Sequence, residues 1–380
     1  MNIFKRKLTV CGSFGFGNAG DEAIPLSYHS LLKAAGVDYS VDVLSRYAKP
    51  DMPEVIGTSD ASRVDAIRNQ AIVVSGGGAI EHNEGAIILK CRNFLSQSFS
   101  SNIAFIGVSV EPGVDYDWAI KRKVKKVLSQ STLPSIYTRD MLSEITLRKL
   151  YPQLNIKTIG DLVLWLDASK LKPISFPKQL GEKYIAVSLS SCWSDEPEWY
   201  DWIVAELLAL TKEHNANIVF MPMSIRGDDD RVEHKKIADM LENHRDCNAV
   251  IACINEETCP TGIAAVYRDA MLVVSMRLHG CVMAYGQRTP FVGISYHPKV
   301  VGFSYTVGLR KCVVPVKSPN KQSDGAYGFR FKDLDLEKGE LLATSSRAID
   351  EQDFSSLDYY KQRSLSTIKL FLTSIEANGK

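Results

Sequence analysis

The sequence has 380 residues, and this length predicts two to three domains on the usual prior of about 150 residues each. Its composition, 45% hydrophobic and 23% charged, is ordinary for a soluble globular protein. The formal net charge of +1 gives no basis for nucleic-acid binding by the whole surface, so any anion site must come from a local cluster.

Short apolar runs alternate with helical patterns along the first half of the chain. Strands are predicted at 8–11, 40–44, 71–75, 102–108, 135–138 and 156–159, and helices at 22–35, 62–69, 85–99, 118–129 and 141–150. Nearly continuous apolar strands that alternate with helices predict a parallel, doubly wound sheet. Residues 1–168 are therefore expected to form an N-terminal Rossmann-like domain.

This alternation breaks at residues rich in lysine and proline, and a linker is predicted at 169–183. The alternation then resumes, with strands predicted at 184–189, 217–221, 249–252, 271–275 and 291–294 and helices at 198–213, 229–242, 258–267 and 279–285. Residues 184–315 are expected to form a C-terminal Rossmann-like domain. The expected fold class is α/β, with two Rossmann-like domains facing across a cleft and mostly parallel sheets.

Residues 316–380 are expected to form a polar loop and an amphipathic helix that packs back on the domains, with a membrane-surface helix as the alternative. No run approaches the roughly 18 apolar residues of a membrane span, and no signal peptide is expected. None of the eight cysteines forms a C-x-x-C pair, which favours reduced, buried thiols in a cytoplasmic protein over disulfides or a metal site.

The loop after the first strand contains the pattern G-x-G-x-x-G at Gly15, Gly17 and Gly20, which is typical of a dinucleotide site. Asp21 and Glu22 follow in the first helical turn, where they would repel a pyrophosphate. Sugar hydroxyls suit this loop better, with Asp21 as a hydrogen-bond acceptor or base. Alternatively, the glycines make a tight turn and Asp21 caps the helix.

Three further loops of the predicted sheets carry candidate ligand contacts. The triplet Gly76 to Gly78 could form an anion nest after its strand, with Gly77 and Gly78 against the anion. Arg139 could clamp a carboxylate or phosphate, or pair with Asp140. Trp193 offers a flat apolar face to a sugar ring.

The most informative loop follows the predicted strand 271–275, where Arg277 and His279 lie two residues apart. In an extended segment two such side chains point the same way, and together they would make an anion site with a proton donor. Lys299, in the first turn of a later helix, could add a positive charge, or it could be a solvated lysine. Arg226 is a further candidate for contact with an anion.

Taken together, these loops resemble the polysaccharide pyruvyltransferase family. The matching segments span roughly residues 8 to 310 and are Gly15–Glu22, Ser75–Gly78, Tyr137–Asp140, Ser275–His279 and Gly293–Lys299. The resemblance implies a fold like the GT-B glycosyltransferases, a phosphoenolpyruvate donor, a sugar or lipid-linked oligosaccharide acceptor, and no metal or other cofactor. Gly280 differs, since similar proteins often carry alanine there.

The resemblance also implies that Arg139, Arg277, His279 and Lys299 bind the donor and catalyse the reaction. It makes residues 1–168 the acceptor side and residues 184–315 the donor side, with Gly77 and Gly78 as further donor contacts. Phosphoenolpyruvate carries a carboxylate and a phosphate, which the cations could hold. His279 would protonate the methylene carbon and Asp21 would accept the hydroxyl proton, while Asn18 and Glu22 contact the acceptor. The expected enzyme is a transferase of capsule or exopolysaccharide biosynthesis that forms a pyruvate ketal and releases phosphate.

Two other enzyme classes fit part of this pattern. A nucleotide-sugar-dependent glycosyltransferase would place Arg and Lys on a diphosphate. A nicotinamide-dependent dehydrogenase would use the glycine pattern, which the two acidic residues argue against. The basic run from Lys121 to Lys126 is expected to be a solvated helix face, with contact to anionic lipid at the inner face of the membrane as the alternative.

Overall fold

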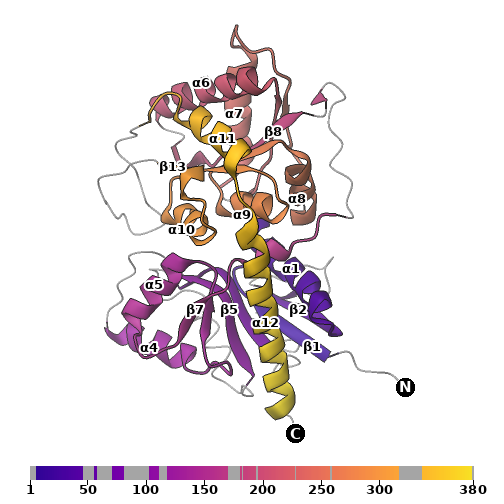
Figure 1. Cartoon of the computed structure of the whole chain (residues 1–380), viewed down its shortest axis with the longest axis vertical. Coiled ribbons are helices and arrows are strands. Elements are labelled where there is room, and N and C mark those ends of the chain that lie inside the picture. The colour runs from indigo at the N-terminus through magenta and orange to yellow at the C-terminus, as the bar shows by residue number, and fades with distance from the viewer. Residues whose placement is uncertain are drawn as a thin grey trace. The chain divides into compact units, whose positions relative to one another are not determined.

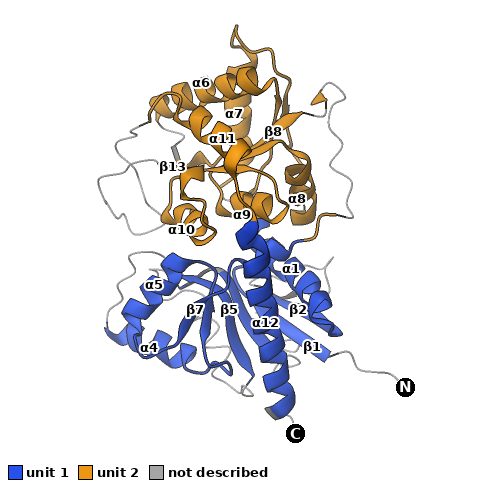
Figure 2. Ribbon diagram, in the orientation of Figure 1, with its two compact units in different colours: residues 1–166, 355–380 blue, residues 167–354 orange. Residues whose placement is uncertain are grey.

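The computed structural model describes two compact units, formed by residues 1–166 with 355–380 and by residues 167–354 (Figure 2). The described residues are 6–45, 55–57, 71–80, 102–110, 118–169, 180–181, 183–193, 196–226, 228–256, 259–315 and 336–378. Nearly all of the predicted linker, and the helices predicted at 62–69 and 85–99, lie outside these ranges.

Unit 1 contains a seven-stranded parallel sheet, in the order β3-β2-β1-β4-β5-β6-β7. Its strands are β1 (Arg6–Cys11), β2 (Tyr39–Ser45), β3 (Val55–Gly57), β4 (Ala71–Ile80), β5 (Ile103–Val110), β6 (Ile136–Thr138) and β7 (Ile156–Thr158). Every residue of β5 is buried, as expected for a central strand covered on both faces. The chain winds outward in both directions from the neighbouring strands β1 and β4.

The helices of unit 1 include one from the far end of the chain (Figure 1). They are α1 (Ala19–Ala35), α4 (Trp118–Leu128), α5 (Met141–Leu150), the short 3-10 helix η1 (Leu162–Trp165) and α12 (Ser355–Asn378). The indole of Trp165 donates a hydrogen bond of 2.7 Å to Ser364 Oγ in α12. Gly160 leaves room for this helix, because a Cβ there would lie 2.7 Å from Tyr360 Cβ.

Unit 2 contains a six-stranded parallel sheet, in the order β10-β9-β8-β11-β12-β13. Its strands are β8 (Tyr184–Ser188), β9 (Asn217–Phe220), β10 (Ile251–Cys253), β11 (Leu272–Ser275), β12 (Phe291–Ser295) and β13 (Val313–Pro315). Its helices are α6 (Pro197–His214), α7 (Asp230–Glu242), α8 (Pro260–Asp269), α9 (Leu278–Gly286), α10 (Pro298–Thr306), α11 (Glu340–Glu351), and the 3-10 helices η3 (Ser191–Trp193) and η4 (Arg310–Cys312). The order reverses direction between β8 and β11, which makes this a doubly wound sheet.

The predicted fold class, α/β with parallel sheets in two Rossmann-like units, is confirmed. One prediction about β4 is wrong: the glycine triplet lies inside the strand, not in a loop after it. The pairing of β4 with β5 shifts register on both sides of Gly76, because glycines within a strand weaken regular pairing and permit bulges. The short strands β3 and β13 and the helix α11 were not predicted.

Two findings concern location and thiol chemistry. Among the described residues, no helix is long and apolar enough to cross a membrane. All the cysteines described are free, but Cys192 and Cys259 are exposed and Cys247 and Cys253 are half-buried, so the prediction of buried thiols fails for these four.

Candidate functional site

The candidate site of unit 2 lies at the carboxyl ends of its central strands. Ligands of open α/β sheets bind at this edge, where the strand order reverses. The loops after β8 and β11 flank that reversal, and those after β9 and β12 lie next to them. The first three of these segments carry Ser190, Ser224 and Arg277, and Lys299 lies at the start of the helix that follows β12.

Arg277 lies between β11 and α9, directly before the first residue of the helix. Its backbone has the extended conformation of a helix N-cap, with φ −81° and ψ 127°. The hydroxyl of Ser275 fixes this turn, since it accepts from the Arg277 amide at 3.1 Å and donates to the Arg277 carbonyl at 2.9 Å. His279 is already the second residue of α9 and is 7% exposed. The expectation of an extended segment from Arg277 to His279 is therefore wrong, because the helix begins at Leu278.

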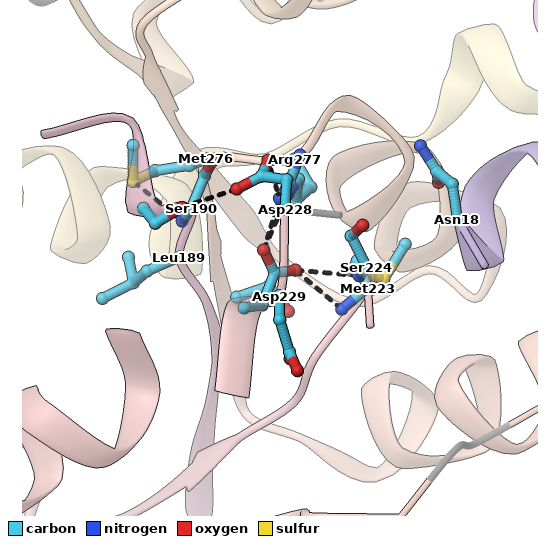
Figure 3. A network of polar contacts seen from close by, with 12 residues as sticks. Asn18, Leu189, Ser190, Met223, Ser224, Asp228, Asp229, Met276 and Arg277 are labelled. Atoms are coloured by element: carbon cyan, nitrogen blue, oxygen red, sulfur yellow. Dashed lines mark hydrogen bonds and ion pairs between the residues drawn. The ribbon is translucent and has the colours of Figure 1, made fainter. Parts of the chain in front are cut away.

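Two carboxylates hold the Arg277 guanidinium (Figure 3). Its Nη2 donates to Asp228 Oδ2 at 2.6 Å and also to Asp230 Oδ1, and its Nε donates to Asp230 Oδ1 at 3.2 Å. Asp230 Oδ2 accepts from the backbone amides of Met223 and Ser224, each at 2.9 Å. The loop after β9 is thereby tied to the start of α9.

The charges of this cluster support each other. Burial opposes the charge on Arg277, but the carboxylates of Asp230 and Asp228 raise the guanidinium pKa above its ordinary value. Burial would raise the pKa of Asp228, yet Arg277 and the Ser191 hydroxyl lower it below its ordinary value. For the more deeply buried Asp230, desolvation prevails over Arg277 and raises the pKa.

The loop after β8 rests on a buried histidine of α7. The Leu189 amide donates to His234 Nε2 at 3.0 Å, and the next amide, of Ser190, donates to the Met276 sulfur at 3.4 Å. Burial lowers the pKa of His234 to about 3, so its ring is neutral and can accept this bond. The loop after β8 is thus positioned by His234, which could no longer accept the bond from the Leu189 amide if its ring were protonated.

Gly280 leaves room for the serine that shapes this turn. A Cβ at Gly280 would overlap Ser275 Oγ and would lie 2.9 Å from Ser275 Cβ. Glycine at this position is therefore matched to Ser275, which gives a structural reason for the departure from alanine.

Lys299 lies in the first turn of α10, next to Pro298 as predicted. The cap is His297, whose Nδ1 accepts from the Lys299 amide at 3.2 Å. The ammonium group lies 5.7 Å from the centre of the Tyr296 ring. Because β12 is paired with β11, Lys299 and Arg277 follow neighbouring strands.

The remaining candidates of unit 2 are less well placed. The side chain of Arg226 is exposed on the loop before α7. Trp193 ends η3, and its side chain lies outside the described part of the structure. Within the described residues, no group of three or more His, Cys, Asp or Glu side chains could hold a metal ion.

In unit 1, the loop after β1 is held mainly by its own polar side chains. Asn18 caps α1, since its Oδ1 accepts from the Gly20 amide at 3.0 Å. Glu22 Oε1 accepts from the Gly17 amide at 3.3 Å. The alternative in which Asp21 caps the helix is therefore wrong, and Asp21 lies half-buried in the first turn.

Unit 1 also holds the glycines and the arginine of the predicted donor site. Gly12 passes so close to β4 that a Cβ there would overlap the Ser75 carbonyl oxygen. Gly77 and Gly78 belong to β4 itself. Arg139 is buried after β6 with its Nε 3.3 Å from Asp140 Oδ2, which is the ion pair named as its alternative.

The structure thus brings Arg277, His279 and Lys299 to one edge of the unit 2 sheet, whereas the other main candidates belong to unit 1. Sequence reasoning missed Asp228 and Asp230 as partners of Arg277. Their signal was the acidic run Asp228–Asp230 at the end of one loop and the start of a predicted helix.

Comparisons with known proteins identify the family and support the fold. Residues 18–298 match the family model described as polysaccharide pyruvyl transferase. A search of curated proteins finds no match.

Similar solved structures include UDP-GlcNAc 2-epimerases. That of Methanocaldococcus jannaschii has a TM-score of 0.61 at 12% identity, covering 97% of this chain and 99% of that chain. That of Neisseria meningitidis, bound to UDP-GlcNAc, has a TM-score of 0.53 at 13% identity, covering 98% and 100%. At such identities the likeness shows the fold alone, which is GT-B-like.

Proposed function

The chain belongs to the polysaccharide pyruvyl transferase family, and on that premise we propose that it transfers the pyruvate unit of phosphoenolpyruvate to sugar hydroxyls. The acceptor would be a polysaccharide or its lipid-linked precursor, and the product a pyruvate ketal. One observation carries the proposal: two cations, Arg277 and Lys299, follow neighbouring strands beside the reversal of the unit 2 sheet. A small dianionic or trianionic donor fits such a pair.

The start of α9 adds to this anion site. Helix N-termini attract negative charge, because their first amides have no partner within the helix. No side chain of the described residues caps α9 in the way that Asn18 caps α1. The phosphate or carboxylate of the donor would lie at this helix start, beside Arg277.

His279 is the proposed general acid of the reaction. The donor's methylene carbon must gain a proton before an acceptor oxygen can bond to its C2, and a histidine can donate one at neutral pH. The first hydroxyl loses its proton to a base, for which Asp21 is the proposed residue. A second hydroxyl of the same sugar then displaces phosphate, which leaves with that hydroxyl's proton, and the ketal ring closes.

Binding and turnover test this function separately. Phosphoenolpyruvate should raise the melting temperature of the protein, and Lys299→Ala should reduce this rise because it removes a positive charge from the anion site. The Lys299 side chain is half-buried, so it can be removed without opening the core. With an acceptor present, release of inorganic phosphate should fall by about 10²–10⁴-fold in His279→Ala. Full activity in that variant would remove His279 from the mechanism.

The second candidate is a nucleotide-sugar-dependent enzyme of the same fold. The observation in its favour is the likeness to UDP-GlcNAc 2-epimerases, one of them bound to UDP-GlcNAc. Uridine diphosphate should then raise the melting temperature, while phosphoenolpyruvate should not.

A lipid-linked acceptor would place the enzyme at a membrane, and α4 is the proposed contact. The helix carries five cations and no acidic residue, so the rest of the chain has a formal charge of −4. Trp118, at its start, is 74% exposed, with the Arg122 guanidinium 5.5 Å from its ring centre. An exposed tryptophan beside cations suits the headgroup layer of an anionic bilayer.

Vesicle sedimentation tests this contact. Phosphatidylglycerol vesicles should sediment the protein, phosphatidylcholine vesicles should not, and Lys125→Glu with Lys126→Glu should abolish the difference. The matched control reverses two exposed lysines of unit 2, Lys183 and Lys212. If both double variants lose sedimentation with phosphatidylglycerol vesicles to the same extent, the net charge of the protein, not α4, is responsible for binding.

A further inference from the structure

Two aspartates bind the same guanidinium but differ in how firmly they are held. Asp230 is 0% exposed, and both of its oxygens are occupied: Oδ1 by Arg277 and Oδ2 by the amides of Met223 and Ser224. Removing it from Arg277 would leave a buried carboxylate without its cation. Asp230 is therefore a permanent partner of the arginine.

Asp228 is held much less firmly. Its side chain is 48% exposed, against 13% for Arg277. It accepts one bond of 2.6 Å from Arg277 Nη2 (Figure 3), and one of 2.5 Å from Ser191 Oγ. A half-exposed carboxylate can return to water at a small cost, because solvent replaces both bonds.

The guanidinium also has donors to spare. Among the described residues, its hydrogen bonds run from Nε and Nη2 to the two aspartates, and none runs from Nη1. A guanidinium can bind a carboxylate or phosphate through two parallel bonds at either of two edges, and since Asp230 occupies the edge of Nε and Nη2, the edge of Nη1 and Nη2 is the one left for a ligand. Asp228 occupies half of that edge.

We propose that Asp228 is an internal anion that occupies the oxyanion position on Arg277 and is displaced when the ligand binds. The guanidinium and the two carboxylates together carry a formal charge of −1, which repels an incoming anion. Once Asp228 has moved away, the anion meets only the neutral pair of Arg277 and Asp230. The ligand class is a carboxylate or phosphate with two oxygens to span Nη1 and Nη2. That this ligand is phosphoenolpyruvate rests on the proposed function; the exchange itself holds for any such oxyanion.

Asp228 would then set a threshold for binding. A weak monovalent anion gains little by replacing a carboxylate that is already in place. A ligand with two anionic groups can bind both Arg277 and Lys299. Its contacts then contribute more binding free energy than is lost with the bond between Asp228 and Arg277. The aspartate would thus lower affinity for every anion and favour multiply charged ones.

The test measures binding of inorganic phosphate and of phosphoenolpyruvate by calorimetry to the wild type and to four single variants. Asp228→Asn keeps the shape and the bond from Ser191 but removes the competing charge. It should tighten both ligands by about tenfold or more, the effect of losing one charge-assisted bond. Asp230→Asn should weaken both, because it loosens the guanidinium.

Asp229→Asn is the matched control. It removes one charge from the same run, but Asp229 pairs with Arg231, and asparagine can still cap α7. Asp228→Ala serves as the second variant, so that an altered fold in one replacement is recognised by its melting curve. If the Asp228 variants bind the anions more tightly than Asp229→Asn does, the proposed exchange of Asp228 for the ligand on Arg277 is supported.

Other outcomes separate the two proposals. Equal affinities in Asp228→Asn and Asp229→Asn overturn the exchange, and so does an absence of phosphate binding in every variant. If Asp228→Asn binds phosphate more tightly while phosphoenolpyruvate binds to no variant, the exchange holds and the proposed donor is wrong.

Discussion

The two units reverse strand order in the same way, yet the loops at the two reversals have opposite chemistry. In unit 1 the reversal lies between β1 and β4, where Asn18 and Glu22 bind backbone amides of their own loop. In unit 2 it lies between β8 and β11, where Arg277 is paired with two carboxylates. The topology brings loops together in both units, and the side chains decide whether hydroxyls or anions are suited to them.

The two loops also differ in what stabilises them. The unit 1 loop depends on a helix cap and on glycines that allow close packing, interactions that work at any pH near neutral. The unit 2 loops depend on a buried ion pair and on a neutral buried histidine, so they should be more sensitive both to single charge changes and to acid.

The largest expected effect comes from removing the cation of unit 2. Arg277→Ala should lower the free energy of unfolding by about 3–5 kcal/mol, because Asp230 is left as a buried, unpaired carboxylate. Urea unfolding measures it. The double variant Arg277→Met with Asp230→Asn should recover much of the loss, and no recovery would show that the packing of Arg277, not its charge, matters.

Glycines at the two reversals give the next comparison. Gly12→Ala drives a Cβ into the Ser75 carbonyl of a neighbouring strand, which cannot move, and should cost about 3 kcal/mol. Gly280→Ala meets the Ser275 hydroxyl, which can rotate only by giving up its bonds to the Arg277 backbone, and Ser275 Cβ at 2.9 Å, so it should cost nearer ~2 kcal/mol.

Melting and urea unfolding of both glycine variants check the order of these effects. Combining Gly280→Ala with Ser275→Gly should remove the clash in unit 2, and a larger loss for Gly280→Ala than for Gly12→Ala would contradict the assigned contacts.

The regular part of the fold could be predicted because its signals are local. The pattern of α5 predicted a helix at 141–150, and the structure has it at Met141–Leu150. The three-residue strands β3 and β13 carry too few residues to show any period. The start of α1 was predicted late, at residue 22, because Asn18 rather than Asp21 is the cap.

The site was predicted in part, for a different reason. Arg277 and Lys299 could be named as candidates because each follows a predicted strand, and ligands bind at the carboxyl ends of parallel strands. The partners of Arg277 were not predictable from spacing, because Asp230 lies 47 residues away and approaches only through the order of β9, β8 and β11. Likewise, nothing near Leu189 in the sequence indicates that His234 accepts its amide.

Acid should destabilise unit 2 through His234. Its folded pKa of about 3 lies below the ordinary 6.5, so between these values the unfolded chain binds a proton that the folded protein does not. Stability therefore falls as the pH drops below 6.5, by up to about 1.4 kcal/mol per pH unit from this residue. In His234→Gln, which keeps an acceptor for the Leu189 amide, the loss between pH 7 and pH 5 should be smaller by about 2 kcal/mol.

Urea unfolding at the two pH values measures this difference, with His244→Gln as a control on an exposed histidine. An unchanged pH dependence in His234→Gln would mean that His234 is not held neutral in the fold.

The smallest effect is expected at the helix cap of unit 1. Asn18→Ala removes the acceptor for the Gly20 amide and should cost about 1 kcal/mol, whereas Asn18→Asp keeps an acceptor and should cost less. Urea unfolding distinguishes the two variants. Asn18 is also a proposed acceptor contact, so binding of the sugar acceptor should be measured in both. If Asn18→Asp keeps the stability but loses the acceptor, the amide contacts the sugar. If it keeps both, Asn18 is a structural cap, and the hydroxyl-binding role in unit 1 falls to Asp21.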